Sequence, residues 1–248
     1  MDRVLVATLN IRNLADRWEE RLPLLLADMA ALQPDLIGLQ EVVYPLQQDR
    51  LLGAAGEGRY EAHRAWAGRP EYGNSVLAKA PLIAEAAERL DLEAGRSALR
   101  LLVRLPGGAR LVFAATHLHH VPADDAVRER QAVVLLDWLA GVPEHDAIVA
   151  VGDFNAEPDE PAAARMRDAG FASAYALANG ADPAVTWPSG LQAPGMDIDG
   201  DPGCLDYVWV RGAATVEQAR LAFDRPAVGD ATLYPSDHLG IAAWLVVE

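Results

Sequence analysis

The stretch IVAVGDFNAEPDEP, residues 148–161, carries the strongest indication of the fold. Its apolar run at 148–151 is typical of a short buried strand, and the run stops at Gly152, with Asp153 and Asn155 just beyond it. Because Gly, Asp and Asn are also common turn formers, the stretch alone fits two interpretations. In the first interpretation the stretch is a strand followed by an ordinary turn. In the second it is a strand that presents a carboxylate and an amide to a substrate. Other polar residues at strand ends would favour the second.

On both sides of this stretch, short apolar runs alternate with amphipathic patterns. Strands are predicted near 4–9, 35–39, 59–66, 73–79, 82–90, 98–105, 110–117, 146–151, 205–210, 215–223 and 240–247. Helices are predicted at 17–32, with Asp16 as its cap, and at 46–55, 124–139 and 161–169. No repeat or linker divides the chain, so we expect a single domain over residues 1–248. This order predicts an α/β fold, a layered sandwich of two packed sheets with helices outside.

The composition indicates a folded protein with an acidic surface. Of 248 residues 51% are hydrophobic, and 21 basic against 36 acidic residues give a net charge of −15. This charge offers no general attraction for duplex DNA, so phosphate chemistry would need metal ions to supply positive charge. No apolar run approaches the ~20 residues of a membrane-spanning helix, the amino terminus has no export-signal pattern, and Cys204 is the only cysteine. We therefore expect a cytoplasmic protein without a transmembrane segment.

Polar side chains recur at or beside the ends of the predicted strands. They are Asn10, Glu41, His117, Asp153, Asn155, Asp206, Asp237 and His238. Each one alone also fits a structural role, as a turn residue, a cap, a salt-bridge partner or a buried histidine. Together they offer the oxygen ligands that Mg²⁺ prefers, and histidines that hydrogen-bond phosphate or move protons near neutral pH. The recurrence favours a functional site.

Ten motifs extend this pattern over residues 8–240. In chain order they are TLNIRN (8–13), LQEV (39–42), YGNSVLAKAPL (72–82), RSALR (96–100), ATHLHH (115–120), RERQA (128–132), VGDFNAEP (151–158), TWPS (186–189), LDYVWV (205–210) and SDHLG (236–240). With these motifs the chain resembles the endonuclease/exonuclease/phosphatase superfamily of metal-dependent phosphoesterases. The resemblance implies a four-layer α/β sandwich, with two mixed β-sheets packed face to face and flanked by helices, and an active site at one edge.

The resemblance also implies a metal site for Mg²⁺ or Mn²⁺. Glu41 matches the family's principal metal ligand, and Asn10 lies beside it. Asp237 matches an additional carboxylate on the metal side. Whether one or two ions act stays open.

Catalytic roles follow from the same resemblance. Asp153 matches the residue that orients or deprotonates the attacking water, and Asn155 matches a phosphate contact. His238 matches a histidine that contacts the scissile phosphate or serves as general base, and Asp206 matches the partner that holds its ring. His117 falls where the family has a second phosphate-facing histidine or a tyrosine.

Three further residues are candidate substrate contacts: Arg96, Asn74 and Trp187. Arg96 would contact phosphate or form a structural salt bridge, and Trp187 would stack on a base or pack in the core. The family often has a carboxylate two residues before the arginine of RSALR. Ala94 stands there, so we do not expect Glu93 to pair with His117.

Two other features have competing interpretations. His119 would line the cleft or make a structural hydrogen bond. The stretch DIDGDPG, 197–203, is similar to a calcium loop, but Pro202 occupies the glycine position and Val208 the glutamate position. We therefore expect a solvated acidic loop near Asp206.

The sequence thus predicts a divalent-metal-dependent phosphoesterase, and more narrowly a phosphodiesterase acting on a small phosphodiester, a nucleotide or single-stranded nucleic acid. The alternatives are a DNA endonuclease or exonuclease, a phospholipid phosphodiesterase, and a non-catalytic binding protein that keeps the fold. Because the net charge is −15 and the basic residues are scattered, long duplex DNA is not a favoured substrate.

Overall fold

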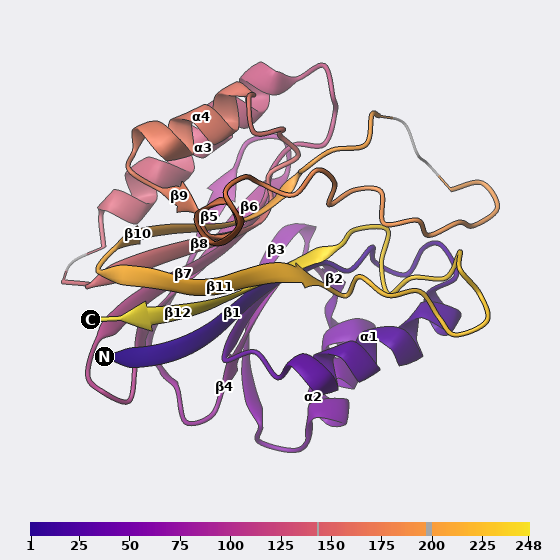
Figure 1. Ribbon diagram of the computed structural model, residues 1–248, viewed down its shortest axis with the longest axis horizontal. Coiled ribbons are helices and arrows are strands. Elements are labelled where there is room, and N and C mark those ends of the chain that lie inside the picture. The colour runs from indigo at the N-terminus through magenta and orange to yellow at the C-terminus, as the bar shows by residue number, and fades with distance from the viewer. Residues whose placement is uncertain (143, 197–199) are drawn as a thin grey trace.

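The computed structural model describes residues 1–142, 144–196 and 200–248, which form two six-stranded sheets (Figure 1). The strands of the first sheet are β1 (Asp2–Asn10), β2 (Leu36–Val43), β3 (Tyr60–Arg69), β4 (Tyr72–Lys79), β11 (Ala214–Ala222) and β12 (Gly240–Val247). Their order in the sheet is β11-β12-β1-β2-β4-β3. β1 and β2 are parallel and the other neighbours are antiparallel, so the sheet is mixed.

The second sheet is mixed in the same way. Its strands are β5 (Ile83–Leu92), β6 (Arg96–Arg104), β7 (Arg110–His117), β8 (Ala147–Asp153), β9 (Ala172–Ser173) and β10 (Asp206–Gly212). They are arranged as β5-β6-β7-β8-β10-β9, and β7 and β8 are the parallel pair.

Helices cover the outer faces of both sheets (Figure 1). On the first sheet lie α1 (Trp18–Leu32) and α2 (Asp49–Ala55), with the π-helical turn η1 (Tyr44–Gln48) before α2. On the second lie α3 (Asp125–Ala140) and α4 (Pro161–Asp168), and the short α5 (Ala174–Asn179) follows β9. This arrangement confirms the predicted four-layer sandwich. β9 and α5 were not predicted, because each is too short to show a periodic pattern.

Alternating side chains account for the layers. In β1, Val4 and Val6 belong to the core between the sheets, whereas Ala7 and Leu9 pack against α1. The same division occurs in β7, where Phe113 faces the other sheet and the next residue, Ala114, lies in the apolar cluster under α3. Because successive residues of a strand point to opposite faces, a strand buried on both faces needs a continuous apolar run. Polar groups therefore gather at the strand ends.

The two sheets approach each other closely at Gly38 of β2. A Cβ atom at this position would lie 2.5 Å from Cγ2 of Val151 and 2.9 Å from Cβ of Ala115, so only glycine fits. This contact brings β2 against β7 and β8 just before the polar residues at the ends of these strands.

The strand ends meet at one edge of the sandwich. The parallel pair β1–β2 aligns Asn10 with Gln40, and the parallel pair β7–β8 aligns His117 with Asp153. β10 is antiparallel to β8 and begins with Asp206 opposite Asp153. β12 is antiparallel to β1, so the loop before β12 also lies at this edge, while both chain termini lie at the opposite end (Figure 1).

Asp16 does not cap α1 as predicted. Arg17 takes the N-cap position with φ 60° and no side chain caps the helix. Asp16 instead accepts a hydrogen bond from Nε of Arg12 at 2.7 Å, because a nearby guanidinium competes with the helix amides for its carboxylate.

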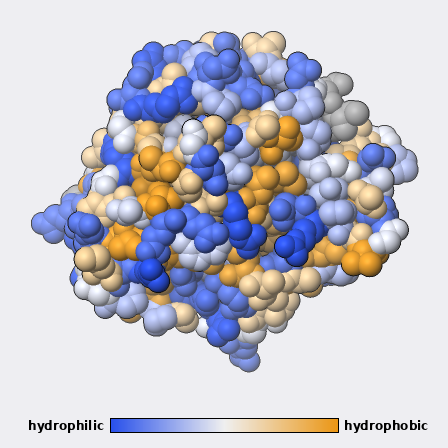
Figure 2. All heavy atoms as spheres, viewed as in Figure 1, coloured by the Kyte–Doolittle hydropathy of each residue, from blue (hydrophilic) through white to orange (hydrophobic). Residues whose placement is uncertain are grey.

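The surface mixes polar and apolar residues on the face shown in Figure 2. Within the described part of the chain, no helix combines the length and the apolar composition needed to cross a bilayer.

Candidate active site

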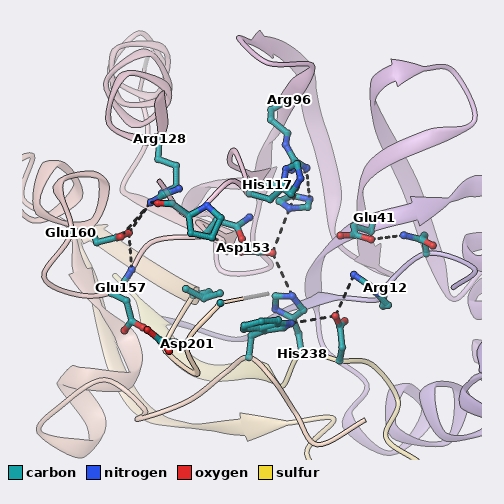
Figure 3. Close-up of a pocket in the computed structure, with 18 of the residues that line it drawn as sticks. Arg12, Glu41, Arg96, His117, Arg128, Asp153, Glu157, Glu160, Asp201 and His238 are labelled. Atoms are coloured by element: carbon teal, nitrogen blue, oxygen red, sulfur yellow. Dashed lines mark hydrogen bonds and ion pairs between the residues drawn. The ribbon is translucent and has the colours of Figure 1, made fainter. Parts of the chain in front are cut away.

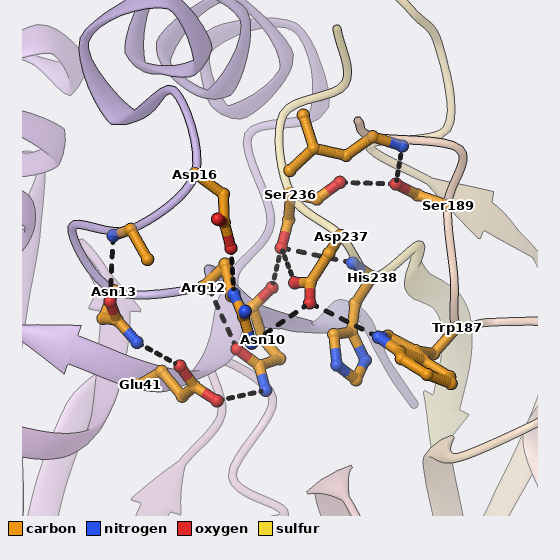
Figure 4. Close-up of polar contacts among 12 residues, drawn as sticks. Asn10, Arg12, Asn13, Asp16, Glu41, Trp187, Ser189, Ser236, Asp237 and His238 are labelled. Atoms are coloured by element: carbon orange, nitrogen blue, oxygen red, sulfur yellow. Dashed lines mark hydrogen bonds and ion pairs between the residues drawn. The ribbon is translucent and has the colours of Figure 1, made fainter. Parts of the chain in front are cut away.

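The polar strand ends converge on one cluster of buried side chains. Nδ2 of Asn10 donates a hydrogen bond to Oδ2 of Asp153 at 3.0 Å, across 143 residues of sequence and between the two sheets. The same amide lies 3.3 Å from Oε1 of Glu41 near the end of β2 (Figure 4). Asn10 therefore connects the predicted metal side of the site with its predicted catalytic side.

His238 is held by two aspartates. Its Nδ1 lies 2.9 Å from Oδ2 of Asp206, and its Nε2 lies 3.7 Å from Oδ2 of Asp153. All three side chains are buried. Burial lowers the pKa of His238, but the charges of Asp206, Asp153 and Asp237 outweigh it and raise that pKa to about 10. Asp206 thus orients a protonated imidazole whose Nε2–H points toward Asp153.

Asp153 is a buried carboxylate with several donors. Oδ1 accepts a hydrogen bond from the backbone N–H of Asn155 at 2.9 Å, and Oδ2 lies 3.4 Å from Nε2 of His117. Burial raises the pKa of Asp153 to about 6, against the opposing effect of the His238 charge. A carboxylate of this kind accepts a proton more readily than an exposed one near neutral pH.

Glu41 lies on the other side of the cavity. It has a positive φ of 58°, and its Oε2 accepts a hydrogen bond from Nδ2 of Asn13 at 2.6 Å. Asp237 lies near it but contacts other groups: its Oδ2 is 3.5 Å from Nη1 of Arg12 and 3.3 Å from Nε1 of Trp187 (Figure 4).

The donor set fits a divalent cation. Ligand atoms of Asp153, Asp206 and His238 lie within 4.8 Å of one another, and among the described residues Oδ1 of Asp206 is buried without a hydrogen-bond partner. Glu41 adds a further carboxylate that faces the same cavity. The charge of one protonated imidazole does not balance these three carboxylates, and a bound metal ion would stabilise the excess, so the cluster is consistent with a metal site.

These residues surround a cavity of about 590 Å³ (Figure 3). The sequence-predicted residues that line it are Glu41, Arg96, His117, Asp153, Asn155, Trp187, Asp237 and His238. Asn10, Asp206 and Asn74 are not among the lining residues. Asn10 and Asp206 act on the cavity through the residues that they contact.

Asn74 lies behind the cavity. It is 2% exposed, and its Nδ2 donates a hydrogen bond to the backbone oxygen of Ser97 at 2.7 Å. The amide thus links β4 to β6 beside a small pocket that Asn74 shares with Glu41, Arg96 and His117, and its contact with substrate stays a prediction.

The tryptophans of the motifs TWPS and LDYVWV, Trp187 and Trp209, differ in the structure. Trp187 lines the cavity, whereas Trp209 is fully buried and stacks on Tyr207 with ring centroids 4.8 Å apart. Of the two interpretations of His119, the structure supports the structural hydrogen bond, because its Nε2 lies 2.8 Å from Oδ2 of Asp124.

Arg96 faces the cavity without a carboxylate partner among the described residues. Its Nη1 lies 3.1 Å from Nδ1 of His117, and its Nη2 lies 2.9 Å from Nδ1 of His120. Glu93 pairs with Arg130 at 2.8 Å and not with His117, as expected from Ala94. The structural salt bridge considered for Arg96 is not formed in the described part of the chain.

Several residues that line the cavity were not predicted from the sequence: Arg12, Asn13, Tyr72, His120, Arg128, Glu157 and Glu160. Most of these residues belong to the ten motifs, and this position was the one feature of the sequence that could have indicated them. Only tertiary contacts show which of them face the cavity. Asp201 of the acidic loop also lines the cavity, as expected for a loop near Asp206. Asp197 and Asp199 lie outside the described residues.

Comparisons with known proteins agree with this geometry. Nocturnin of Xenopus laevis is 27% identical over 253 residues, covering 91% of this chain and 64% of the relative. Nocturnin of Rattus norvegicus is 28% identical, covering 91% and 58%. The chain therefore spans about three fifths of the length of these curated relatives.

Solved structures share the fold. The human nocturnin catalytic domain with bound sulfate anion superposes with a TM-score of 0.82 at 22% identity, covering 100% of this chain and 97% of that one. TDP2 of D. rerio complexed with single strand DNA product has a TM-score of 0.81 at 18% identity, covering 99% of each. The model of the endonuclease/exonuclease/phosphatase family matches residues 7–238. Since this match spans nearly the whole chain, the chain belongs to the endonuclease/exonuclease/phosphatase family.

Proposed function

We propose that this protein is a Mg²⁺- or Mn²⁺-dependent phosphodiesterase that acts on a small phosphodiester, a nucleotide or single-stranded nucleic acid in the cytoplasm. The observation that carries the proposal is the line of buried groups from Asp206 through His238 to Asp153, beside a cavity that Glu41 faces from the other side.

Glu41 would hold the ion, with Asn10 and Asp237 beside it. Asn10 and Asn13 orient the Glu41 carboxylate by hydrogen bonds, and Arg12 and Trp187 orient Asp237. When bound, the ion supplies positive charge that offsets the charge of the phosphate oxygens.

Asp153 serves as the group that orients and deprotonates water. Its raised pKa suits proton acceptance, and the hydrogen bonds from Asn10 and Asn155 fix its two oxygens. His238 serves as a donor to the phosphate, because Asp206 and Asp153 keep its imidazole protonated. A positioned donor of this kind stabilises charge that develops in the transition state.

His117 and Asn155 contact the phosphate oxygens from the second sheet, and Arg96 and Trp187 contact the parts of the substrate beyond them. Burial, followed by the charge of Arg96, lowers the pKa of His117, so His117 remains neutral and acts by hydrogen bonding. The intact set of contacts argues against a non-catalytic binding protein, for which no such alignment is needed.

The substrate class is supported by size and charge. A cavity of about 590 Å³ holds more than one phosphate group, and a net charge of −15 repels long duplexes. The TDP2 relative was solved with a single-strand DNA product, which agrees with a single-stranded or nucleotide substrate.

A substrate screen tests the proposal. Bis-p-nitrophenyl phosphate, nucleotides, phosphomonoesters and single-stranded oligonucleotides are incubated with Mg²⁺ or Mn²⁺ and with excess chelator. We expect metal-dependent release of product from at least one diester. No hydrolysis of any phosphoester with either metal would contradict the proposal.

A further inference from the structure

Arg96 has no carboxylate within ion-pair distance among the described residues. Other arginines around the site have carboxylate partners: Arg12 contacts Asp16 at 2.7 Å, and Arg128 contacts Glu160 at 3.2 Å. The side chains that contact Arg96 within this part of the chain are two histidines, His117 and His120. A guanidinium that faces a cavity without a counter-ion is stabilised by an anion in that cavity.

The two histidines leave Arg96 available to a ligand. Nη1 of Arg96 lies 3.1 Å from Nδ1 of His117 and its Nη2 lies 2.9 Å from Nδ1 of His120, and since a guanidinium only donates, each imidazole accepts a hydrogen bond from it. Since Nδ1 of His120 accepts from Arg96, the ring proton lies on Nε2, which is left as a donor. Arg96 and His120, named here the rim pair, therefore offer N–H groups at the cavity.

The rim pair stands close to the catalytic residues but apart from them. His117 separates the two: Nη1 of Arg96 is 3.2 Å from its Nε2, and that Nε2 is 3.4 Å from Oδ2 of Asp153. An anion on the rim pair would thus lie one imidazole ring away from the carboxylate that acts on the scissile phosphate.

The opposite end of the cavity cannot take an anion in the same way. It is lined by Glu157, Glu160 and Asp201, and the cation there, Arg128, is already bound to Glu160 (Figure 3). Burial raises the pKa of Glu157, and the nearby carboxylates of Asp159, Glu160 and Asp201 add to this effect. A second anionic group of a substrate is repelled at this end and attracted at the other.

We propose that the rim pair binds a second phosphate group of the substrate, next to the scissile one. The preferred substrates are then compounds with two neighbouring phosphates, as in a diphosphate, and not simple monoanionic diesters. The inference rests on the proposed function for the position of the scissile phosphate.

Isothermal titration tests this inference without turnover. The probes are methylenebisphosphonate and inorganic phosphate, each titrated into the native protein and its variants at the same free Mg²⁺ concentration. We expect the bisphosphonate to bind at least ~10-fold more tightly than phosphate. Arg96→Gln and His120→Ala should reduce this ratio by about 10-fold, the size of one hydrogen bond to a charged group.

Two further variants serve as controls. Arg130→Gln removes an equal charge from an exposed arginine outside the cavity and should keep the ratio. Arg96→Lys keeps the positive charge and should retain part of the affinity ratio between the two probes. This variant therefore separates a binding defect from misfolding. Equal affinity for the two probes in the native protein, or an unchanged ratio in Arg96→Gln and His120→Ala, would overturn the inference. Because binding is measured directly, this failure is distinct from a failure of hydrolysis.

Discussion

The two ends of the catalytic cavity have opposite character although they belong to one acidic protein. At one end Arg96, His117 and His120 form a cationic and hydrogen-bonding wall. At the other end Glu157 and Asp201 form an acidic wall. The net charge of −15 agrees with the acidic wall but gives no indication of the cationic one. The difference shows that the total charge of a chain does not describe the charge along one of its cavities, and the proposed positions of the substrate phosphates rest on the local charge.

The acidic end of the cavity also depends on specific contacts between residues. A Cβ atom on Gly203 would lie 1.6 Å from Oε1 of Glu157, so a larger residue there would displace this carboxylate from its position. Gly203 also pairs with Trp187, which joins the acidic end to the aromatic wall. Since the two ends meet at Asp153 and His238, the first predictions concern the centre.

The largest effect is expected from loss of the metal. Glu41→Ala or excess chelator should abolish hydrolysis, because the ion offsets phosphate charge that neither end neutralises alone. Circular dichroism should show an intact fold, and added Mg²⁺ should restore the chelated native protein. Glu217→Ala, which removes a carboxylate on β11 that pairs with Arg3, is the control and should retain activity. Full activity of Glu41→Ala would refute the metal role.

Loss of Asp153 or His238 should come next. Asp153→Asn should lower kcat by ~10²–10⁴, the usual contribution of a general base. His238→Ala should lower kcat by ~10²–10³, the usual loss when one donor to the transition-state charge is removed. Asp206→Asn should cause a similar or smaller loss, because it orients His238 without touching substrate.

Thermal unfolding provides the control for these three variants. Since burial makes the Asp153 charge unfavourable in the folded state, Asp153→Asn should not lower the melting temperature markedly. Equal losses of stability and activity in all three variants would indicate that they serve the structure only.

The acidic end should limit the length of the substrate. We expect small diesters or single-stranded substrates to be cleaved in preference to plasmid DNA at equal enzyme and Mg²⁺. Glu157→Gln with Asp201→Asn should narrow this preference by several-fold, because two repulsive charges are removed. Product release from small diesters and plasmid nicking, both at low and moderate salt, measure it. Efficient plasmid nicking by the native protein with small esters untouched would restore the nuclease alternative.

The smallest effect is expected at the aromatic wall. Trp187→Phe keeps the aromatic face but loses the hydrogen bond from Nε1 to Asp237. A net hydrogen bond contributes about 0.5–1.5 kcal/mol, so we expect a change of a few-fold in kcat/KM. Trp209→Phe is the matched control for a tryptophan outside the cavity, and its effect should fall on stability. A larger loss of activity in Trp209→Phe than in Trp187→Phe would contradict this assignment.

Much of the fold could be predicted because its causes are local. The apolar alternation of β1 and the stripe of Leu22, Leu25 and Met29 in α1 appear in the sequence itself and are buried as expected. A prediction failed where a local rule met a tertiary competitor: Asp16 has the position of a cap but binds Arg12. The hydrogen bond from Asn74 to Ser97 is likewise a tertiary contact that the motif around Asn74 does not display.

The order of helices and strands along the chain, the polar residues at their ends and the family can be read from the amino-acid sequence, because periodicity and motifs are properties of neighbouring residues. Which of these side chains share a cavity depends on the packed fold. Asn10 meets Asp153 across 143 residues, and Arg96 meets His120 instead of a carboxylate. Such pairings depend on how the two sheets pack, and sheet packing is a sum over many distant contacts that no single stretch of sequence displays.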